Sequence, residues 1–174
     1  MKDSIIFIAL VVLSILLPYQ IVIATLSLTS ARQNVFDYLL NNQPLDTGFN
    51  AREISHLYDV KLVMAWTTAI FVLSLIVAIL FYRQIPARSF GAAGITILAL
   101  AILLVSATFF SFDQLFHYFH SIFFIAGTWL FEPTDKLIQL FPLTFFISIT
   151  KRILIGSILC GIALIIKSRS TYRS

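Results

Sequence analysis

The sequence predicts an all-α integral membrane protein with four transmembrane helices and a small extracellular cap built from the two outer loops. Of its 174 residues, 59% are hydrophobic and only 11% are charged, whereas soluble domains carry about 25% charged residues. Four apolar segments are also long enough to cross a bilayer, which takes about 20 helical residues. No repeat, low-complexity tract or Gly/Ser linker divides the chain. We therefore expect residues 1–174 to form a single membrane domain.

The four predicted spans cover about residues 4–28, 62–82, 90–112 and 143–166. The first has 25 residues, more than the apolar core of a cleaved signal peptide, so we expect it to be retained. Trp66 and Tyr82 lie near the two ends of the second span, where membrane interfaces favour aromatic residues. The two remaining long segments, about 29–61 and 113–142, are expected to form the cap.

Basic residues are distributed unevenly about these spans. The side that holds both termini has one acid, Asp3, and six basic residues: Lys2, Arg83, Arg88, Lys167, Arg169 and Arg173. The other side has six basic residues and seven acids. The positive-inside rule then places both termini in the cytoplasm and the cap at the outer face of the membrane. This distribution accounts for the net charge of +4, so no nucleic acid is expected as a partner.

Residues 112–142 are unusually rich in aromatic and titratable side chains. They hold nine of the 25 aromatic residues, two of the three histidines and the acids Asp113, Glu132 and Asp135. The apolar run between His120 and Glu132 has only 11 residues, too few to cross a bilayer. One interpretation is an interfacial hairpin joining two membrane helices. The other is a site in which burial among aromatic rings tunes a pKa for chemistry.

The first outer segment ends in a helix start. Asn50 is placed as the N-cap, with Glu53 at the capping-box position three residues later. Glu53, His56 and Asp59 then recur at a spacing of three, on one helix face. Two carboxylates beside an imidazole would raise its pKa and orient its ring. The alternative is a solvated polar face preceding a membrane helix.

Lys151 and Arg152 interrupt the fourth predicted span. Only 14 residues separate Arg152 from Lys167, about 21 Å of helix. The two cations either lie at the outer interface or point into the bundle, and both positions put positive charge beneath the cap. Simple snorkelling of the side chains to the interface is the alternative.

Few mechanisms suit this inventory of side chains. The chain lacks a Gly-x-Ser-x-Gly elbow, a phosphate-binding loop and a dinucleotide fingerprint. A metal site is conceivable from His117 and His120 with His56 and Asp59, although no HExxH motif or cysteine pair supports it. Covalent catalysis lacks an obvious nucleophile on the outer side. The remaining mechanism is general acid or base catalysis by histidine at the membrane surface.

Two motifs then match a known family. The first is Glu53-Ile-Ser-His56-Leu-Tyr-Asp59-Val60-Lys61, and the second comprises Phe119, His120, Phe123, Phe124, Trp129, Asp135, Leu137, Ile138 and Pro142. In order and spacing they resemble the lipoprotein intramolecular transacylase family of Gram-positive bacteria. The resemblance extends over nearly the whole chain, although the first outer loop is short for the family.

The resemblance implies a membrane acyltransferase. Its substrate is a diacylglyceryl-modified bacterial lipoprotein with a free α-amine on the N-terminal cysteine, and the sn-2 acyl chain moves to that amine to give lyso-form lipoprotein. By motif, the catalytic pair falls on His56 and His120, with no cofactor or metal. We expect nine further residues to bind or position substrate or membrane lipid: Glu53, Asp59, Lys61, Phe119, Phe123, Phe124, Trp129, Asp135 and Arg152.

Two other functional classes stay open at this point. The chain could be a non-enzymatic membrane accessory subunit whose polar cap is a docking surface. It could also be a lipid-binding protein with a groove beneath the aromatic cap.

Overall fold

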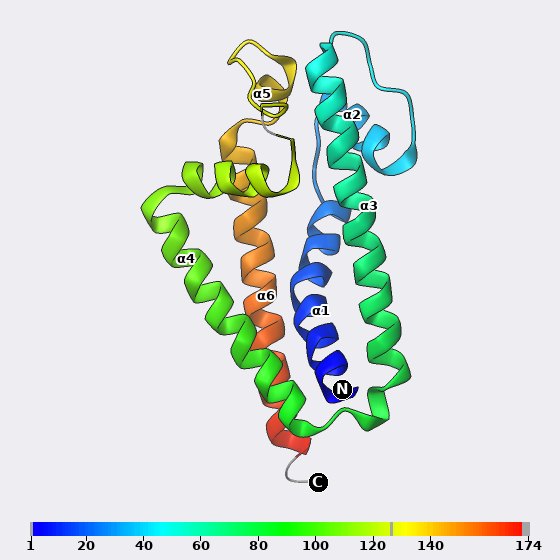
Figure 1. Ribbon diagram of the computed structural model, residues 1–174, viewed down its shortest axis with the longest axis vertical. Helices are drawn as coiled ribbons and strands as arrows, with labels where there is room; N and C mark the ends of the chain where they lie inside the picture. The colour runs from blue at the N-terminus through cyan, green and yellow to red at the C-terminus, as the bar shows by residue number, and fades with distance from the viewer. Residues whose placement is uncertain (1, 126, 172–174) are drawn as a thin grey trace.

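Four long helices run side by side and carry a cap at one end (Figure 1). The computed structural model describes residues 2–125 and 127–171, without the side chains of residues 109 and 110. The elements in order are α1 (Lys2–Ala24), α2 (Ser30–Asn41), α3 (Ala51–Leu80), the 3-10 turn η1 (Tyr82–Gln84), α4 (Ala87–Phe123), α5 (Lys136–Leu140) and α6 (Leu143–Thr171). Lys2–Ala24, Ala51–Leu80, Ala87–Thr108 and Leu143–Ser170 are long and apolar enough to span a membrane. The predicted all-α class with four spans is confirmed.

Helix α1 lies at the centre of the bundle, in contact with α3, α4 and α6. Helices α4 and α6 pack closely because small residues meet between them. A Cβ on Gly94 would lie 2.6 Å from the carbonyl oxygen of Gly161, and a Cβ on Gly156 would lie 2.7 Å from Cβ of Pro18 on α1. Such small residues let helix backbones approach within a membrane.

Both described chain ends lie at the end of the bundle opposite the cap (Figure 1). A cluster of apolar side chains closes this end: Ile6, Leu10, Ile85, Phe90 and Ala93. Arg88 pairs with Asp3 across it. The basic side of the sequence is therefore one physical end of the molecule, apart from Arg173, which lies outside the described residues.

The helix bounds depart from the predicted ones near the cap. The capping helix predicted from Asn50 and the second span form a single 30-residue helix, α3, about 45 Å long. This exceeds the bilayer core of about 30 Å. The charged first part, residues 51–61, therefore extends into the cap, and 62–80 is the membrane-spanning part. Helix α1 ends at Ala24 rather than near 28, and α6 continues beyond 166 to Thr171.

Helix α4 continues past its predicted end but changes direction. Ser111 has φ −168° and ψ 108°, an extended conformation that breaks the helix. The hydroxyl of Ser111 accepts a hydrogen bond of 3.2 Å from the backbone N–H of Gln114, which caps a new helical segment. This second segment, residues 112–123, runs across the bundle toward α3 (Figure 1).

The cap has its own apolar core. Val35 and Leu39 from α2 pack with Leu57 from α3 and Leu137 from α5. The apolar face of α2 is thus buried in the cap.

Candidate active site

The start of α3 is held by a complete capping box. The Asn50 side chain accepts from the Glu53 backbone N–H at 2.9 Å, and the Glu53 carboxylate accepts from the Asn50 backbone N–H at 2.7 Å. The other carboxylate oxygen of Glu53 accepts from the backbone N–H of Leu137 at 2.8 Å. Glu53 is only 1% exposed, so this buried carboxylate joins α3 to α5.

His56 lies one helical turn after Glu53, in an aromatic pocket. Its ring centroid is 4.7 Å from that of Phe124, 5.4 Å from that of Phe131 and 5.8 Å from that of His120. His56 is 7% exposed, and its Nδ1 is buried without a hydrogen-bond partner among the described residues. The ring is therefore enclosed by other rings and lies next to the second predicted catalytic histidine.

His120 lies on the second segment of α4, with its ring fixed by the backbone. Its Nδ1 is 2.8 Å from the carbonyl oxygen of Phe116. Because a carbonyl oxygen only accepts, Nδ1 must carry the hydrogen in the neutral ring. The lone pair of the neutral imidazole is then on Nε2, where it can accept a proton.

The surroundings keep both histidines neutral near pH 7. Burial, and to a lesser degree the charge of His120, lowers the pKa of His56 from 6.5 to about 4. Burial also lowers the pKa of His120, against the opposing effect of its hydrogen bond to Phe116. The sequence-based expectation that Glu53 and Asp59 would raise the pKa of His56 is wrong. The Glu53 carboxylate is occupied by two backbone N–H groups, and burial of the imidazole dominates.

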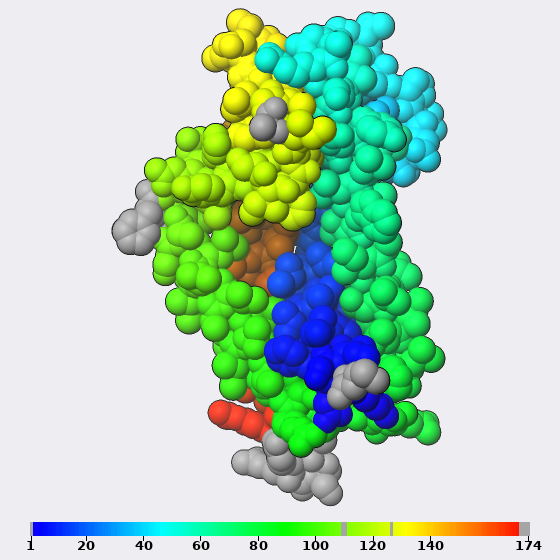
Figure 2. All heavy atoms as spheres, in the orientation of Figure 1, coloured from blue at the N-terminus to red at the C-terminus, as the bar shows by residue number. Residues whose placement is uncertain are grey.

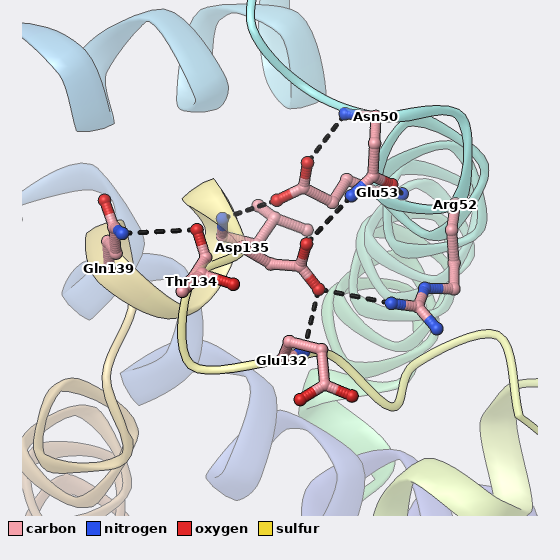
Figure 3. Close-up of polar contacts among 8 residues, drawn as sticks. Asn50, Arg52, Glu53, Glu132, Thr134, Asp135 and Gln139 are labelled. Atoms are coloured by element: carbon pink, nitrogen blue, oxygen red, sulfur yellow. Dashed lines mark hydrogen bonds and ion pairs between the residues drawn. The ribbon is translucent and has the colours of Figure 1, made fainter.

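Asp135 is the second acidic residue that joins the cap. Its carboxylate accepts from the Asn50 side chain at 2.9 Å, from Arg52 at 3.2 Å and from the Glu132 backbone N–H at 2.7 Å. Figure 3 shows these bonds together with those of Glu53. We call Asn50, Arg52, Glu53 and Asp135 the cap latch. It holds the loop that carries Trp129 and Phe131 against the start of α3.

The remaining predicted site residues divide between the histidine pair and the periphery. The Phe124 ring contacts both histidine rings. The ring centroid of Phe119 is 5.6 Å from that of His120 and 4.8 Å from that of Phe123. Phe119 and Phe123 are 45% and 51% exposed, so they form the open side of the cluster. The ring centroid of Trp129 is 5.0 Å from that of His120.

Three predicted residues lie away from the histidine rings. The Lys61 ammonium is 4.3 Å from the ring centroid of Tyr38 and so holds α2 to α3. Asp59 is half-buried on α3. Arg152 and its neighbour Lys151 are exposed on α6, which favours the outer interface over the bundle interior, the other position expected for them.

The metal alternative has little geometric basis. Within residues 2–125 and 127–171, no three His, Cys, Asp or Glu side chains come together as ligands would. His117 is exposed and packs edge-on against Trp129, with ring centroids 4.7 Å apart. The observed pairing is between His56 and His120.

Two residues that build the site were not predicted from the sequence. Phe131 covers His56, and Ser111 starts the helical segment that carries His120. Ser111-Phe-Asp-Gln114 has the capping-box form that marks a helix start, so this signal was present in the sequence. No local sequence pattern indicated that Phe131 would contact His56.

Comparison with protein families matches residues 4–146 to the family described as lipoprotein intramolecular transacylase Lit. The chain belongs to the Lit family. An uncharacterized protein of Aquifex aeolicus (strain VF5) is 33% identical over 119 residues, which cover 66% of this chain. The match spans only 53% of that relative's length.

The fold is also that of solved Lit structures. The in meso structure of lipoprotein intramolecular transacylase Lit from Bacillus cereus superposes with a TM-score of 0.78 at 16% identity, covering 99% of this chain and 93% of that chain. A variant of that protein with one histidine replaced by arginine gives a TM-score of 0.75 at 16% identity, covering 99% of this chain and 91% of that one. At this identity the likeness establishes the shared fold.

Proposed function

We propose that this chain moves the sn-2 acyl group of a diacylglyceryl lipoprotein to the α-amine of its N-terminal cysteine, with His120 as general base. One observation carries the proposal: the Nδ1 of His120 donates to the Phe116 carbonyl oxygen at 2.8 Å. The basic Nε2 is thereby left for a substrate in a pocket next to a second buried histidine. Membership of the Lit family supplies the class of reaction.

The steps balance without a cofactor. The amine nitrogen attacks the ester carbonyl carbon, and its excess proton goes to Nε2 of His120. The tetrahedral intermediate collapses, the bond to the glyceryl sn-2 oxygen breaks, and that oxygen receives the proton. An ester is exchanged for an amide, and the products are the N-acyl group and a free glyceryl hydroxyl.

The lowered pKa values suit this sequence of steps. The amine has a reference pKa near 8, and a base must be neutral to accept its proton. Because two neighbouring imidazolium rings repel, the neutral pair takes up at most one additional proton during the reaction. That proton resides first on His120 and returns to the glyceryl oxygen directly or through His56. Histidine acid–base catalysis typically contributes about 10²–10⁴-fold.

Holding the substrate folded is the larger contribution. Nucleophile and ester belong to one molecule, and their correct placement can lower the barrier by about 7–11 kcal/mol. A groove of about 160 Å³ between α1, α4 and α6 suits an acyl chain; it is lined by Ile15, Ile97, Leu100, Ala101, Leu104, Thr150, Ile153, Leu154 and Ser157. Figure 2 shows α6 at the bottom of a hollow between α1 and α4, beneath the second segment of α4.

The proposed setting is the bacterial cell membrane, with both termini cytoplasmic and the histidine pair at the outer face. The basic residues at the end of the bundle that holds both termini support this orientation. The substrates are membrane-anchored lipoproteins that reach the pair from the bilayer.

The same groove favours a second candidate, a lipid-binding protein without catalysis. Mass spectrometry separates the two. Purified chain is mixed with a synthetic diacylglyceryl lipopeptide that has a free α-amine, and fragmentation locates the acyl group. Transfer to nitrogen at unchanged total mass, lost in His120→Ala, is expected. A wild-type chain that retains the lipopeptide but leaves the ester intact would favour lipid binding.

A further inference from the structure

Trp129 has a buried polar group that the described part of the chain does not use. The indole Nε1–H is buried and has no hydrogen-bond acceptor there. Buried Trp N–H groups usually find a partner, and an unpaired one destabilises a fold. A phenylalanine would fill an aromatic pocket without this penalty, so the N–H calls for an acceptor that residues 2–125 and 127–171 do not supply.

The indole lies beside the proposed base. Its ring centroid is 5.0 Å from that of His120 and 4.7 Å from that of His117. Its N–H does not donate to His120, so the lone pair on Nε2 stays available for a proton. The base and an unused donor therefore lie side by side on the same face of the cap.

The reaction generates one new acceptor next to the base. When the amine attacks, the ester carbonyl oxygen becomes an oxyanion, and a preorganised donor in a site shielded from water stabilises it. The side chains packed around His120 are Phe116, Phe119, Phe124, Trp129 and His56. Among these only Trp129 and His56 carry an N–H, and because the proposed mechanism uses His56 in proton transfer, Trp129 is the donor left for the oxyanion.

We propose that the indole N–H of Trp129 donates a hydrogen bond to the oxyanion of the tetrahedral intermediate. This inference rests on the proposed transacylation and adds a catalytic donor to it. The bond is strongest when the oxygen is charged and relaxes as the amide carbonyl forms, so it changes no proton balance. A donor of this kind acts mainly on kcat and much less on KM.

The test removes the N–H while keeping the ring. The full-length chain is assayed with the diacylglyceryl lipopeptide as wild type, as Trp129→Phe, and with Trp129 replaced by benzothienylalanine, which has sulfur in place of N–H. We expect kcat to fall about 10²–10³-fold, the loss typical of an oxyanion donor. The thermal midpoint should be no lower than that of wild type in the benzothienylalanine protein, which keeps the shape of the indole.

Trp66 provides a matched control. It is the other tryptophan of the chain and is 69% exposed on α3, so Trp66→Phe should leave kcat unchanged. A kcat within about fivefold of wild type in the benzothienylalanine protein would overturn the role of Trp129 while leaving the transacylation intact. Absence of transfer by wild type would instead overturn the proposed function itself. If Trp129→Phe does not fold, the kcat of the benzothienylalanine protein alone tests the role of Trp129.

Discussion

Replacing Glu53 by Gln tests how the cap holds the histidine pair. The carboxylate accepts one backbone N–H from Asn50 and one from Leu137, and the residue is 1% exposed. A glutamine retains one acceptor oxygen and turns an NH2 group toward the other N–H. One charge-assisted bond worth about 1.5–3 kcal/mol is lost, and a buried N–H left unpaired costs about 1–3 kcal/mol.

The expected loss of stability is therefore about 2.5–6 kcal/mol. By the relation for soluble domains of this size, 3 kcal/mol lowers the thermal midpoint by about 6–12 °C. Protease should cut residues 127–140 faster in folded protein, because α5 is released from α3. Transfer should fall as well, since His56 lies one turn after Glu53 and packs against Phe131 of the released loop.

Glu132→Gln is the matched control. Glu132 lies in the same loop with an exposed side chain, and it joins the cap latch through its backbone N–H and carbonyl oxygen, both of which pair with Asp135. The Glu132→Gln protein should have the thermal midpoint and the acyl-transfer activity of wild type. Equal melting of Glu53→Gln and Glu132→Gln would refute the reasoning, because it would mean that the buried carboxylate does not join α3 to α5.

Four further predictions follow from the pair and its setting. Replacing His56 or His120 by Ala should abolish acyl transfer at equal membrane expression, and the double variant should be hardly worse than either single one. His117→Ala should lower the transfer rate tenfold or less, about 1.4 kcal/mol. Full activity in His56→Ala would refute the two-histidine mechanism. Since the pKa of His56 is lowered to about 4, the unfolded chain takes up a proton near pH 6.5 that the folded chain does not. Stability is thus complete above pH 6.5 and falls by about 3 kcal/mol toward pH 4; calorimetry should show a smaller fall in His56→Phe, and equal pH dependence would contradict this origin. Exhaustive chelation should leave acyl transfer unchanged. If chelation abolished transfer and zinc restored it, His56, His117 and His120 would be metal ligands instead. Cysteines at Asn42 and Thr134 in a Cys160→Ala background should react with an impermeant thiol reagent on spheroplasts, and reaction only at Arg88→Cys would invert the orientation.

Much of the fold could be predicted from local sequence. Long apolar runs have few ways to satisfy their backbone in a bilayer other than as helices, which is why four spans could be recognised without tertiary information. The capping box at Asn50 was also readable, because it involves residues only three apart. The equivalent signal at Ser111 was readable too, and it explains why α4 turns across the bundle rather than ending.

The chemistry of the site was decided by tertiary contacts. Spacing placed Glu53 and His56 on one helix face, which suggested a carboxylate that would raise the imidazole pKa. Packing instead assigns that carboxylate to the Leu137 N–H, 84 residues away in sequence, and encloses the imidazole among Phe124, Phe131 and His120, so its pKa falls. Periodicity specifies which side chains share a face, but the partner of each polar atom depends on which distant segment folds against it. The sequence alone therefore determined the membrane helices and the two histidine motifs, and only the tertiary structure decided which groups remain free to act on a substrate.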